Sequence, residues 1–320
     1  MRKKALIIGC TGQDGSLMTK YLLDKGYKVI GTTRLEKYNH KNHQAIGIHD
    51  AFPVQTLNLM DLVEITKFIE DCQPTEIYNL SAQSSVRESF ITPIDTFNSI
   101  SLTTLNILEA CKRIKFDGSL FFAGSSEVFG NTNIPATINT NFNPLNPYAI
   151  AKVNSLQLVK MYRTIYEIKA VTGILFNHES SLRNEKFVTN KIIRAAFRSN
   201  ENNEFQIQFG NLNIARDWGW AEDYVEAMHK MINRKENFQD HLICTGRLTK
   251  LTDFIDKVFG YFNLNWRNHI ISSEEQMRKS DISRNYGDPT GIMKDLNWKS
   301  KLNLDEIIIK LIENYSLSVK

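Results

Sequence analysis

Short apolar segments alternate with amphipathic segments through the first 176 residues of this 320-residue chain. Strands and helices that alternate at this spacing are typical of a doubly wound parallel sheet, and we predict this α/β fold. Continuous apolar runs such as Leu120-Phe121-Phe122-Ala123 fit strands that helices cover on both faces. The predicted strands are Ala5–Gly9, Tyr27–Thr33, Glu76–Ala82, Ser119–Ser125 and Ala170–Phe176. The predicted helices are Gly15–Lys25, Leu62–Cys72, Leu102–Arg113 and Tyr148–Tyr166.

The alternation stops after Asn177, where polar loops separate shorter elements. These loops are Ser180–Lys186, Asn200–Glu204 and Met277–Asp288. Neither a repeat nor a low-complexity linker interrupts the chain, so we expect a smaller mixed α/β lobe packed directly on the first domain. We predict a first domain of residues 1–176 with roughly 212–240, and a second lobe of residues 177–211 and 241–320.

Composition narrows the classes of partner that this chain can bind. The net charge of +4 is dispersed, without the basic tract that indicates a nucleic-acid partner. The apolar run Ala5–Gly9 is too short for a signal peptide, and no stretch is long enough to span a membrane. Four widely spaced cysteines form neither a metal-ligand pattern nor a disulfide framework. We therefore expect a cytoplasmic protein with reduced thiols and without a metal, nucleic-acid or membrane partner.

A glycine-rich turn, Gly9-Cys10-Thr11-Gly12-Gln13-Asp14-Gly15, joins the first predicted strand to the first helix. Ligands of open α/β sheets bind at the carboxyl ends of the strands, where this turn lies. Glycines let the backbone approach a pyrophosphate at the helix N-terminus. The spacing is Gly-x-x-Gly-x-x-Gly, and a bare tight turn is the alternative interpretation. We favour a dinucleotide site, which assigns the cofactor to the first domain.

The residues after the second predicted strand bear on which dinucleotide binds. Arg34 lies about twenty residues beyond the glycines, where an arginine accommodates a 2′-phosphate and an acidic residue binds a free ribose. Arg34 therefore favours NADP. Glu36 leaves NAD open, and a solvated loop arginine is the other alternative.

Tyr148 and Lys152 stand one helical turn apart, with Ser125 upstream at the end of a predicted strand. A nearby ammonium favours the phenolate of a tyrosine, which can then take a proton from a substrate hydroxyl while hydride leaves its carbon. A chance pair on an amphipathic helix face is the alternative. The glycine turn and Ser125, in this order, favour the catalytic interpretation.

Glu127 follows Ser125 by two residues and adds a second acid/base group. A carboxylate here could remove a proton from a carbon next to a new ketone, and then assist the departure of a hydroxyl as water. The alternative is a solvated loop carboxylate.

These residues resemble those of the extended short-chain dehydrogenase/reductase family, whose first domain is of the Rossmann type. Within it, the chain most resembles the GDP-mannose 4,6-dehydratases, almost end to end. The matching blocks are Gly12–Ser16, Glu76–Leu80, Ala82–Ser84, Ser125–Glu127, Pro147–Lys152, Gly173–Ser180, Phe187–Thr189 with Lys191, Arg216–Gly219, Asp223–Met228 and Leu296–Lys299.

The resemblance implies a role for each matching residue. The implied catalytic residues are Ser125, Glu127, Tyr148 and Lys152. The implied cofactor-binding residues are Gly9, Thr11, Gly12, Gln13, Asp14, Gly15, Arg34, Asn58, Leu59, Leu80, Ala82, Gln83, Ser84, Tyr148, Lys152, His178 and Arg183. The implied substrate-binding residues are Ser85, Glu127, Asn177, Val188, Lys191, Arg216 and Arg278, with the cations on the diphosphate.

The implied reaction is C4 oxidation of a GDP-linked hexose, loss of water across C5 and C6, and return of the hydride to C6. The implied partners are a nucleotide-sugar and further copies of the chain, as a homodimer or homotetramer. Departures from the family pattern at Ser181-Leu182-Arg183-Asn184 and near Arg278 leave a GDP-heptose or another hexose open. The alternatives are a GDP-sugar C4 reductase, dehydrogenase or epimerase, and a non-catalytic dinucleotide-binding protein.

Overall fold

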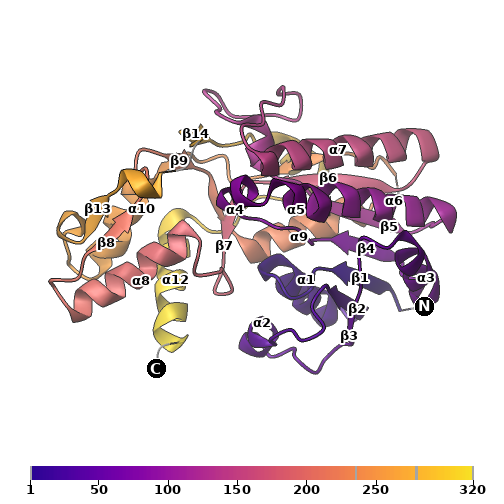
Figure 1. Ribbon diagram of the computed structural model, residues 1–320, viewed down its shortest axis with the longest axis horizontal. Helices are drawn as coiled ribbons and strands as arrows, with labels where there is room; N and C mark the ends of the chain where they lie inside the picture. Colours follow the sequence, from indigo (N-terminus) through magenta and orange to yellow (C-terminus); the bar gives the residue numbers. More distant parts are fainter. Residues whose placement is uncertain (1, 235, 278–279, 319–320) are drawn as a thin grey trace.

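The computed structural model describes residues 2–234, 236–277 and 280–318. Its centre is a seven-stranded sheet in the order β11-β6-β5-β4-β1-β2-β3, in which every neighbouring pair is parallel (Figure 1). The strands are β1 (Lys4–Ile8), β2 (Lys28–Thr33), β3 (Val54–Thr56), β4 (Glu76–Asn79), β5 (Ser119–Ala123), β6 (Ala170–Leu175) and β11 (His241–Ile243). The predicted doubly wound parallel sheet of the Rossmann type is therefore confirmed.

Helices cover both faces of this sheet. They are α1 (Gln13–Asp24), α2 (Lys41–Ala45), α3 (Leu62–Cys72), α4 (Val86–Ile91), α5 (Pro93–Phe97), α6 (Thr103–Arg113), α7 (Pro147–Tyr166), α9 (Ala221–Ile232) and α11 (Thr290–Leu296). A π-helical segment, Asn98–Leu102, joins α5 to α6, and a 3₁₀ turn, Ser126–Phe129, follows β5.

Successive residues of each strand point to opposite faces, and this alternation divides the apolar side chains into two cores. Ala5 and Ile7 of β1 pack with side chains of α1 and α9, whereas Leu6 and Ile8 pack with those of α3, α6 and α7. Both sets are fully buried. This explains why the strands are apolar at every position and not only at alternate ones.

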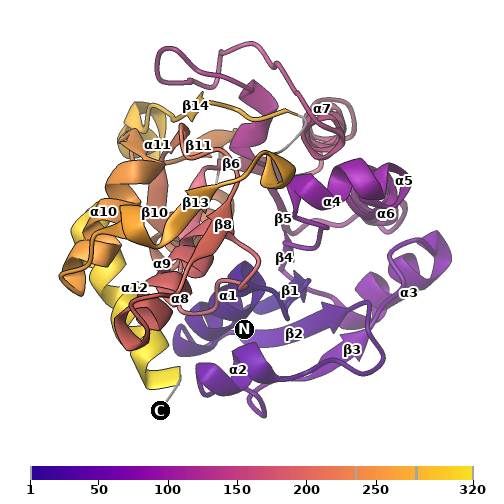
Figure 2. The same cartoon turned by 60° about the vertical axis from the view of Figure 1, so that its left-hand side comes forward.

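The remaining elements build a smaller lobe beside the sheet. They are β7 (Asn177–Glu179), α8 (Val188–Glu201), β8 (Ile207–Phe209), β9 (Ala215–Arg216), β10 (Trp218–Trp220), β12 (Thr249–Lys250), α10 (Leu251–Tyr261), β13 (Ile270–Ser272), β14 (Arg284–Asn285) and α12 (Leu304–Ser318), with 3₁₀ turns at Trp266–Asn268 and Glu274–Gln276. Figure 2 shows α8, α10 and α12 gathered on one side of the sheet with β8 and β13. Apolar residues of these elements form a separate core.

Strand–helix order follows the prediction, and the differences lie at the element ends. The strands predicted to end at Ala82 and Ser125 end at Asn79 and Ala123, so the polar residues beyond them lie in loops at the carboxyl edge. The short β3, α2, α4 and α5 were not predicted, because segments of three to six residues carry little periodicity.

One region assigned to the smaller lobe lies in the central sheet. His241–Ile243 pairs with Gly173–Leu175 as the edge strand β11, although the predicted lobe boundary stood at residue 240. Ile292 and Trp298 from the C-terminal part also pack in the core between α1 and α9. The chain therefore returns to the first domain twice after leaving it.

Among the described residues, no helix is long and apolar enough to cross a membrane. The four cysteines are free and buried, in agreement with the prediction of reduced thiols.

Candidate active site

In the turn after β1, backbone atoms of different segments pack directly against each other. Gly9 has a φ of +86°, and a Cβ on it would lie 2.8 Å from the main chain of Ser81, which follows β4. A Cβ on Gly15 would lie 2.2 Å from the carbonyl oxygen of Gly9. Gly12 is the N-cap of α1, makes no side-chain cap, and has only the Gly9 oxygen within 4 Å of its Cβ position. An open, uncapped helix N-terminus beside a close-packed turn fits a pyrophosphate.

Two residues of the next connection hold this turn in place, and sequence reasoning missed both. The Asn42 Nδ2 donates to the carbonyl oxygen of Thr11 at 2.9 Å, and the His43 Nε2 contacts that of Cys10 at 2.9 Å. His43 is buried. The five-residue α2 that carries them has too few residues for a recognisable period.

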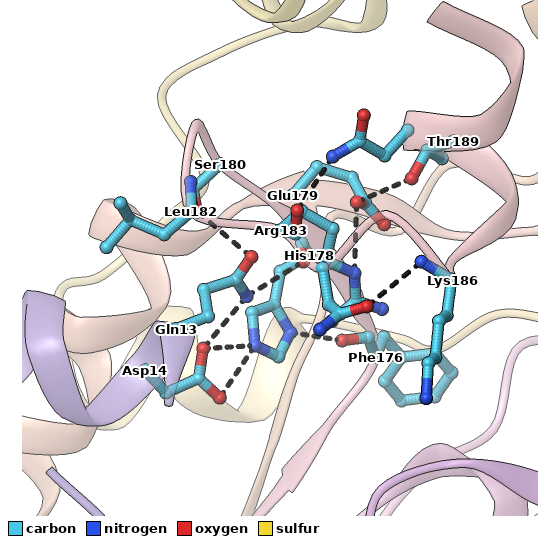
Figure 3. Close-up of polar contacts among 12 residues, drawn as sticks. Gln13, Asp14, Phe176, His178, Glu179, Ser180, Leu182, Arg183, Lys186 and Thr189 are labelled. Carbon is cyan, nitrogen blue, oxygen red and sulfur yellow. Dashed lines mark hydrogen bonds and ion pairs between the residues drawn. The ribbon is translucent and has the colours of Figure 1, made fainter. Parts of the chain in front are cut away.

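The first turn of α1 is bonded to β7 by a compact polar network (Figure 3). His178 Nε2 lies 3.0 Å from both carboxylate oxygens of Asp14, and its Nδ1 lies 2.7 Å from the carbonyl oxygen of Phe176. Gln13 donates to Asp14 at 3.0 Å and accepts from the Ser180 hydroxyl at 2.9 Å. This network joins the glycine turn to the first strand of the smaller lobe.

Asp14 and His178 shift each other's pKa in opposite directions. Burial acts to raise the pKa of Asp14, but the charge and hydrogen bonds of His178, with help from Arg183, lower it to about 2. Burial acts to lower the pKa of His178, but the Asp14 carboxylate outweighs it and raises that pKa. The pair therefore favours a charged carboxylate and a charged imidazole beside the N-terminus of α1.

Arg183 is held in one orientation beside this pair. Its Nε lies 3.2 Å from Oε2 of the buried Glu179, and its guanidinium lies 3.6 Å from the centroid of the Phe187 ring. Thr189 donates to the same Glu179 oxygen at 2.7 Å (Figure 3). The charge of Arg183 lowers the pKa of both Asp14 and Tyr148, so it lies within electrostatic reach of the predicted cofactor and catalytic residues.

Ser125, Tyr148 and Lys152 converge at the carboxyl end of β5. Burial raises the pKa of Tyr148 to about 12, and a hydrogen bond with Ser125 opposes the rise. Lys152 Nζ donates to the carbonyl oxygen of Ala123 at 2.6 Å and lies 5.7 Å from the centroid of the Tyr148 ring. Burial lowers the pKa of Lys152 to about 7, opposed by the Asp14 charge. The three side chains therefore form one buried group.

Glu127 lies in the 3₁₀ turn directly after Ser125. Its backbone N–H donates to the Ser125 Oγ at 3.3 Å, and its Oε2 accepts from the Asn146 Nδ2 at 2.9 Å. The Glu127 charge acts to raise the pKa of Tyr148, and the Asn146 that bonds Glu127 lies two residues before Tyr148. The carboxylate and the predicted hydride-transfer group thus lie at one site, whereas Asn146 was missed by sequence reasoning.

The loops after β3 and β4 line the same edge. The Gln83 Nε2 donates to the carbonyl oxygen of Ser85 at 2.8 Å, and the Ser85 hydroxyl caps α4. Leu80 pairs with Ile8 through the backbone, next to Gly9. Ala82 and Ser84 belong to the same loop. Asn58 and Leu59 follow β3, and the Leu59 carbonyl oxygen accepts from Asn106 at 3.0 Å.

Arg34 is exposed at the end of β2, together with Glu36. Within the described part of the chain, Arg34 makes no ion pair. Its guanidinium is therefore available to an anion at the outer end of the dinucleotide site.

The predicted substrate residues lie where the smaller lobe faces this edge. Asn177 begins β7, Val188 begins α8, and Arg216 is buried in β9. Lys191 Nζ donates to the carbonyl oxygen of Gln208 at 2.7 Å and lies 4.4 Å from the centroid of Phe209. Burial lowers the pKa of Lys191, and so does the charge of Arg87 on α4, a nearby cation that sequence reasoning missed. Arg278 lies outside the described residues.

Comparisons with known proteins agree with this geometry. A family model described as GDP-mannose 4,6 dehydratase matches residues 6–311. GDP-mannose 4,6 dehydratase 1 of Arabidopsis thaliana is 36% identical over 323 residues, covering 98% of this chain and 89% of the relative. The human GDP-mannose 4,6 dehydratase is 34% identical over 339 residues, covering 97% of this chain and 91% of the relative.

Solved structures share the fold at low sequence identity. The dTDP-glucose 4,6-dehydratase of Bacillus anthracis in complex with NAD has a TM-score of 0.87 at 16% identity, covering 98% of this chain and 97% of that one. RMD from Pseudomonas aeruginosa, complexed with NADPH, has a TM-score of 0.81 at 18% identity, covering 99% of both chains. With the family match over nearly its whole length, the chain belongs to the GDP-mannose 4,6-dehydratase family.

Proposed function

We propose that this family member is an NADP-dependent hydro-lyase that converts a GDP-linked hexose, or a GDP-linked heptose, to the 4-keto-6-deoxy sugar. The observation that carries the proposal is the Glu127 carboxylate beside Tyr148. A reductase, a dehydrogenase or an epimerase that acts at C4 alone needs the Ser125–Tyr148–Lys152 group but has no use for a second acid/base residue. Family membership supports the same choice.

The open N-terminus of α1 and the close-packed turn around Gly9 and Gly15 fit a nicotinamide dinucleotide. The free guanidinium of Arg34 favours NADP, because it can neutralise a 2′-phosphate. NAD remains the alternative, since Glu36 is also exposed there. When bound, a nicotinamide would supply the hydride acceptor for sugar C4 and the hydride donor for C6.

Side chains of the protein accept and donate the protons in this reaction. Burial raises the pKa of Tyr148 in the cofactor-free protein, and the positive charges of the Lys152 ammonium and of a bound oxidised nicotinamide would lower it. Tyr148 can then take the C4 hydroxyl proton, while Ser125 holds the same oxygen. Glu127 removes the C5 proton, which the new C4 ketone acidifies, and passes a proton to the departing C6 hydroxyl. Water leaves across C5 and C6. The hydride lost at C4 is regained at C6, and C5 regains a proton when the hydride returns, which balances the C4 hydroxyl proton that Tyr148 took.

The nucleotide-sugar would lie between the sheet edge and the smaller lobe. The charge of Arg87 on α4 contributes to the lowered pKa of Lys191 on α8, and an anion bound near both would offset this repulsion. A diphosphate has the matching charge. We assign Asn177, Ser85, Val188, Arg216 and Arg278 to the same ligand, as the family resemblance implies.

The enzyme is proposed to be a cytoplasmic homo-oligomer, because nucleotide-sugar substrates and free buried thiols both fit that compartment. Exposed apolar side chains of α5, the π-helical segment and α7 support the assembly. They are Ile94, Phe97, Leu102, Ile150 and Met161. These helices contact one another, and apolar surface exposed on neighbouring elements marks protein–protein contacts.

The test is incubation of the purified protein with GDP-mannose and related nucleotide-sugars, followed by mass spectrometry for the loss of water. We expect turnover without net change in reduced cofactor, whereas steady consumption or formation of NADPH would favour the C4 reductase or dehydrogenase. Glu127→Gln should lower dehydration by about 10²- to 10⁴-fold and leave cofactor binding intact. Full dehydration by Glu127→Gln would disprove the role of that carboxylate.

A further inference from the structure

The side chain of Asn146 connects the helix that carries Tyr148 to the carboxylate of Glu127. Its Oδ1 accepts from the backbone N–H of Ala149 at 2.8 Å, and its Nδ2 donates to Glu127 Oε2 at 2.9 Å. A backbone N–H can only donate, so the amide oxygen must face Ala149 and the amino group must face the carboxylate. The hydrogen bond from Ala149 therefore fixes which end of the Asn146 amide is the oxygen and which is the nitrogen.

Helix capping alone does not require asparagine at this position. Asn146 is the N-cap of α7, and aspartate and serine cap helices equally well. Aspartate offers no donor to a second group, and serine offers a single oxygen on a shorter side chain. Asparagine alone among these can accept from the helix with one atom and donate to a carboxylate with another. At 2% exposure, Asn146 has little access to water for either bond.

Asn146 also links the two acid/base groups, because it is bonded to one and lies close in sequence to the other. Tyr148 follows it by two residues, and the intervening Pro147 has a locked φ at the first helical position. The phenol and the carboxylate serve neighbouring sugar carbons in the proposed reaction, so their separation has to be held to a fraction of an ångström.

We propose that Asn146 is a positioning residue for the elimination step: it holds the Glu127 carboxylate in one orientation, aimed at sugar C5 and in register with Tyr148 at C4. Hydrogen bonds are directional, so a donated N–H limits the directions in which the accepting carboxylate oxygen can point. The inference rests on the role proposed above for Glu127. Asn146 acts in the elimination of water and not in the oxidation at C4. The groups for that oxidation, Tyr148 and Lys152, make their own contacts with Ser125 and Ala123.

The variant that tests this is Asn146→Asp, which retains the cap and replaces the donor with a second carboxylate. The matched control is Asn303→Asp, an asparagine whose Oδ1 caps α12 through Glu306 in the smaller lobe. We expect kcat for dehydration to fall by about 10- to 100-fold in Asn146→Asp and to remain unchanged in the control. Asn146→Ser, which also keeps a capping oxygen, is the second variant if the aspartate prevents folding.

Two further readouts separate positioning from general damage. In a single turnover, absorbance at 340 nm should show reduced cofactor accumulating in Asn146→Asp, because C4 oxidation continues while C5 deprotonation slows. Deuterium at sugar C5 should give a larger isotope effect on kcat in Asn146→Asp than in the wild type and in Asn303→Asp.

An unchanged isotope effect, or loss of C4 oxidation in step with dehydration, would overturn the inference. Wild-type turnover by both Asn146 variants would do the same, provided that Glu127→Gln is inactive. If Glu127→Gln dehydrates normally, the proposed base is wrong, and the role of Asn146 fails with it. The two failures are therefore distinguishable.

Discussion

At the scale of single residues, the active site contains buried charged groups that destabilise the fold. Neighbouring contacts offset part of this destabilisation. Lys152 is 4% exposed and compensated by a carbonyl oxygen and the face of Phe122 at 4.9 Å. No carboxylate forms an ion pair with it within the described residues. Burial consequently lowers its pKa to about 7. Such perturbed groups are typical of catalytic sites, where charge is needed in spite of its cost to the fold.

We predict that Lys152→Met inactivates the enzyme and stabilises the cofactor-free fold. The folded-state pKa of about 7 lies below the unfolded value of 10.5, so the unfolded chain binds the extra proton between these limits. Wild-type stability should therefore rise with pH across this window. The gain from Lys152→Met, at most about 5 kcal/mol, should be largest at or below neutral pH and shrink toward pH 10.

Urea unfolding of the cofactor-free protein at about pH 6.5 and about pH 9.5 measures this difference. Lys160→Met, an exposed lysine of the same helix, is the matched control and should change the free energy of unfolding little at either pH. A destabilised Lys152→Met protein at pH 6.5 would contradict the prediction.

At the scale of elements, the contact between α1 and the glycine turn governs the cofactor site. The main chain of the turn leaves no room for a methyl group on Gly15, since its Cβ would lie 2.2 Å from Gly9 O and 2.7 Å from Cys10 Cα. Both neighbours are backbone atoms, which cannot rotate away. The helix N-terminus is therefore held against the strand end at the distance that the predicted pyrophosphate needs.

Gly15→Ala should destabilise the protein by about 1–3 kcal/mol and weaken cofactor binding at least tenfold, because α1 must move away from the turn. Thermal unfolding and titration with NADP and NAD would measure both effects. Gly260→Ala, in α10 with nothing within 4 Å of its Cβ position, controls for the general effect of the substitution. That variant should be neutral or stabilised by about 1 kcal/mol. Equal cofactor affinity in the two variants would contradict the prediction.

At the scale of the whole molecule, the smaller lobe and the sheet are joined at the site itself. Asp14 and His178 connect α1 to β7, and Asp217 bonds the segment between β9 and β10 to Thr245 and Gly246 after β11. The chain crosses between the two parts several times, so cofactor and substrate residues are held in one body.

The exposed apolar surface defined by Ile94, Phe97, Leu102, Ile150 and Met161 belongs to this scale too, because only contacting helices from distant segments create it. We predict that Ile94→Glu converts the homo-oligomer to smaller species, measured by light scattering on size-exclusion chromatography. Ile134→Glu alters a side chain of similar exposure in a loop outside these helices and should leave the mass unchanged. A monomeric wild-type protein would contradict the proposed assembly.

Much of this protein is readable from the sequence alone. Strand–helix order, the glycine turn, and the Ser125, Tyr148 and Lys152 group all depend on local periodicity or on closely spaced residues. Carboxyl ends of parallel strands meet at one edge, so the topology itself predicts that these motifs share a site.

The tertiary structure alone decided the contacts that bring distant residues together. Asn146 reaches Glu127 across 19 positions, His178 reaches Asp14 across 164, and β11 joins the sheet at its edge after the chain has visited the smaller lobe. Such pairings depend on the path of the chain and on which buried polar groups require a partner. The periodicity of a short segment encodes neither the path of the chain nor these partners. The residues that hold the site in place could therefore be identified only in the folded protein.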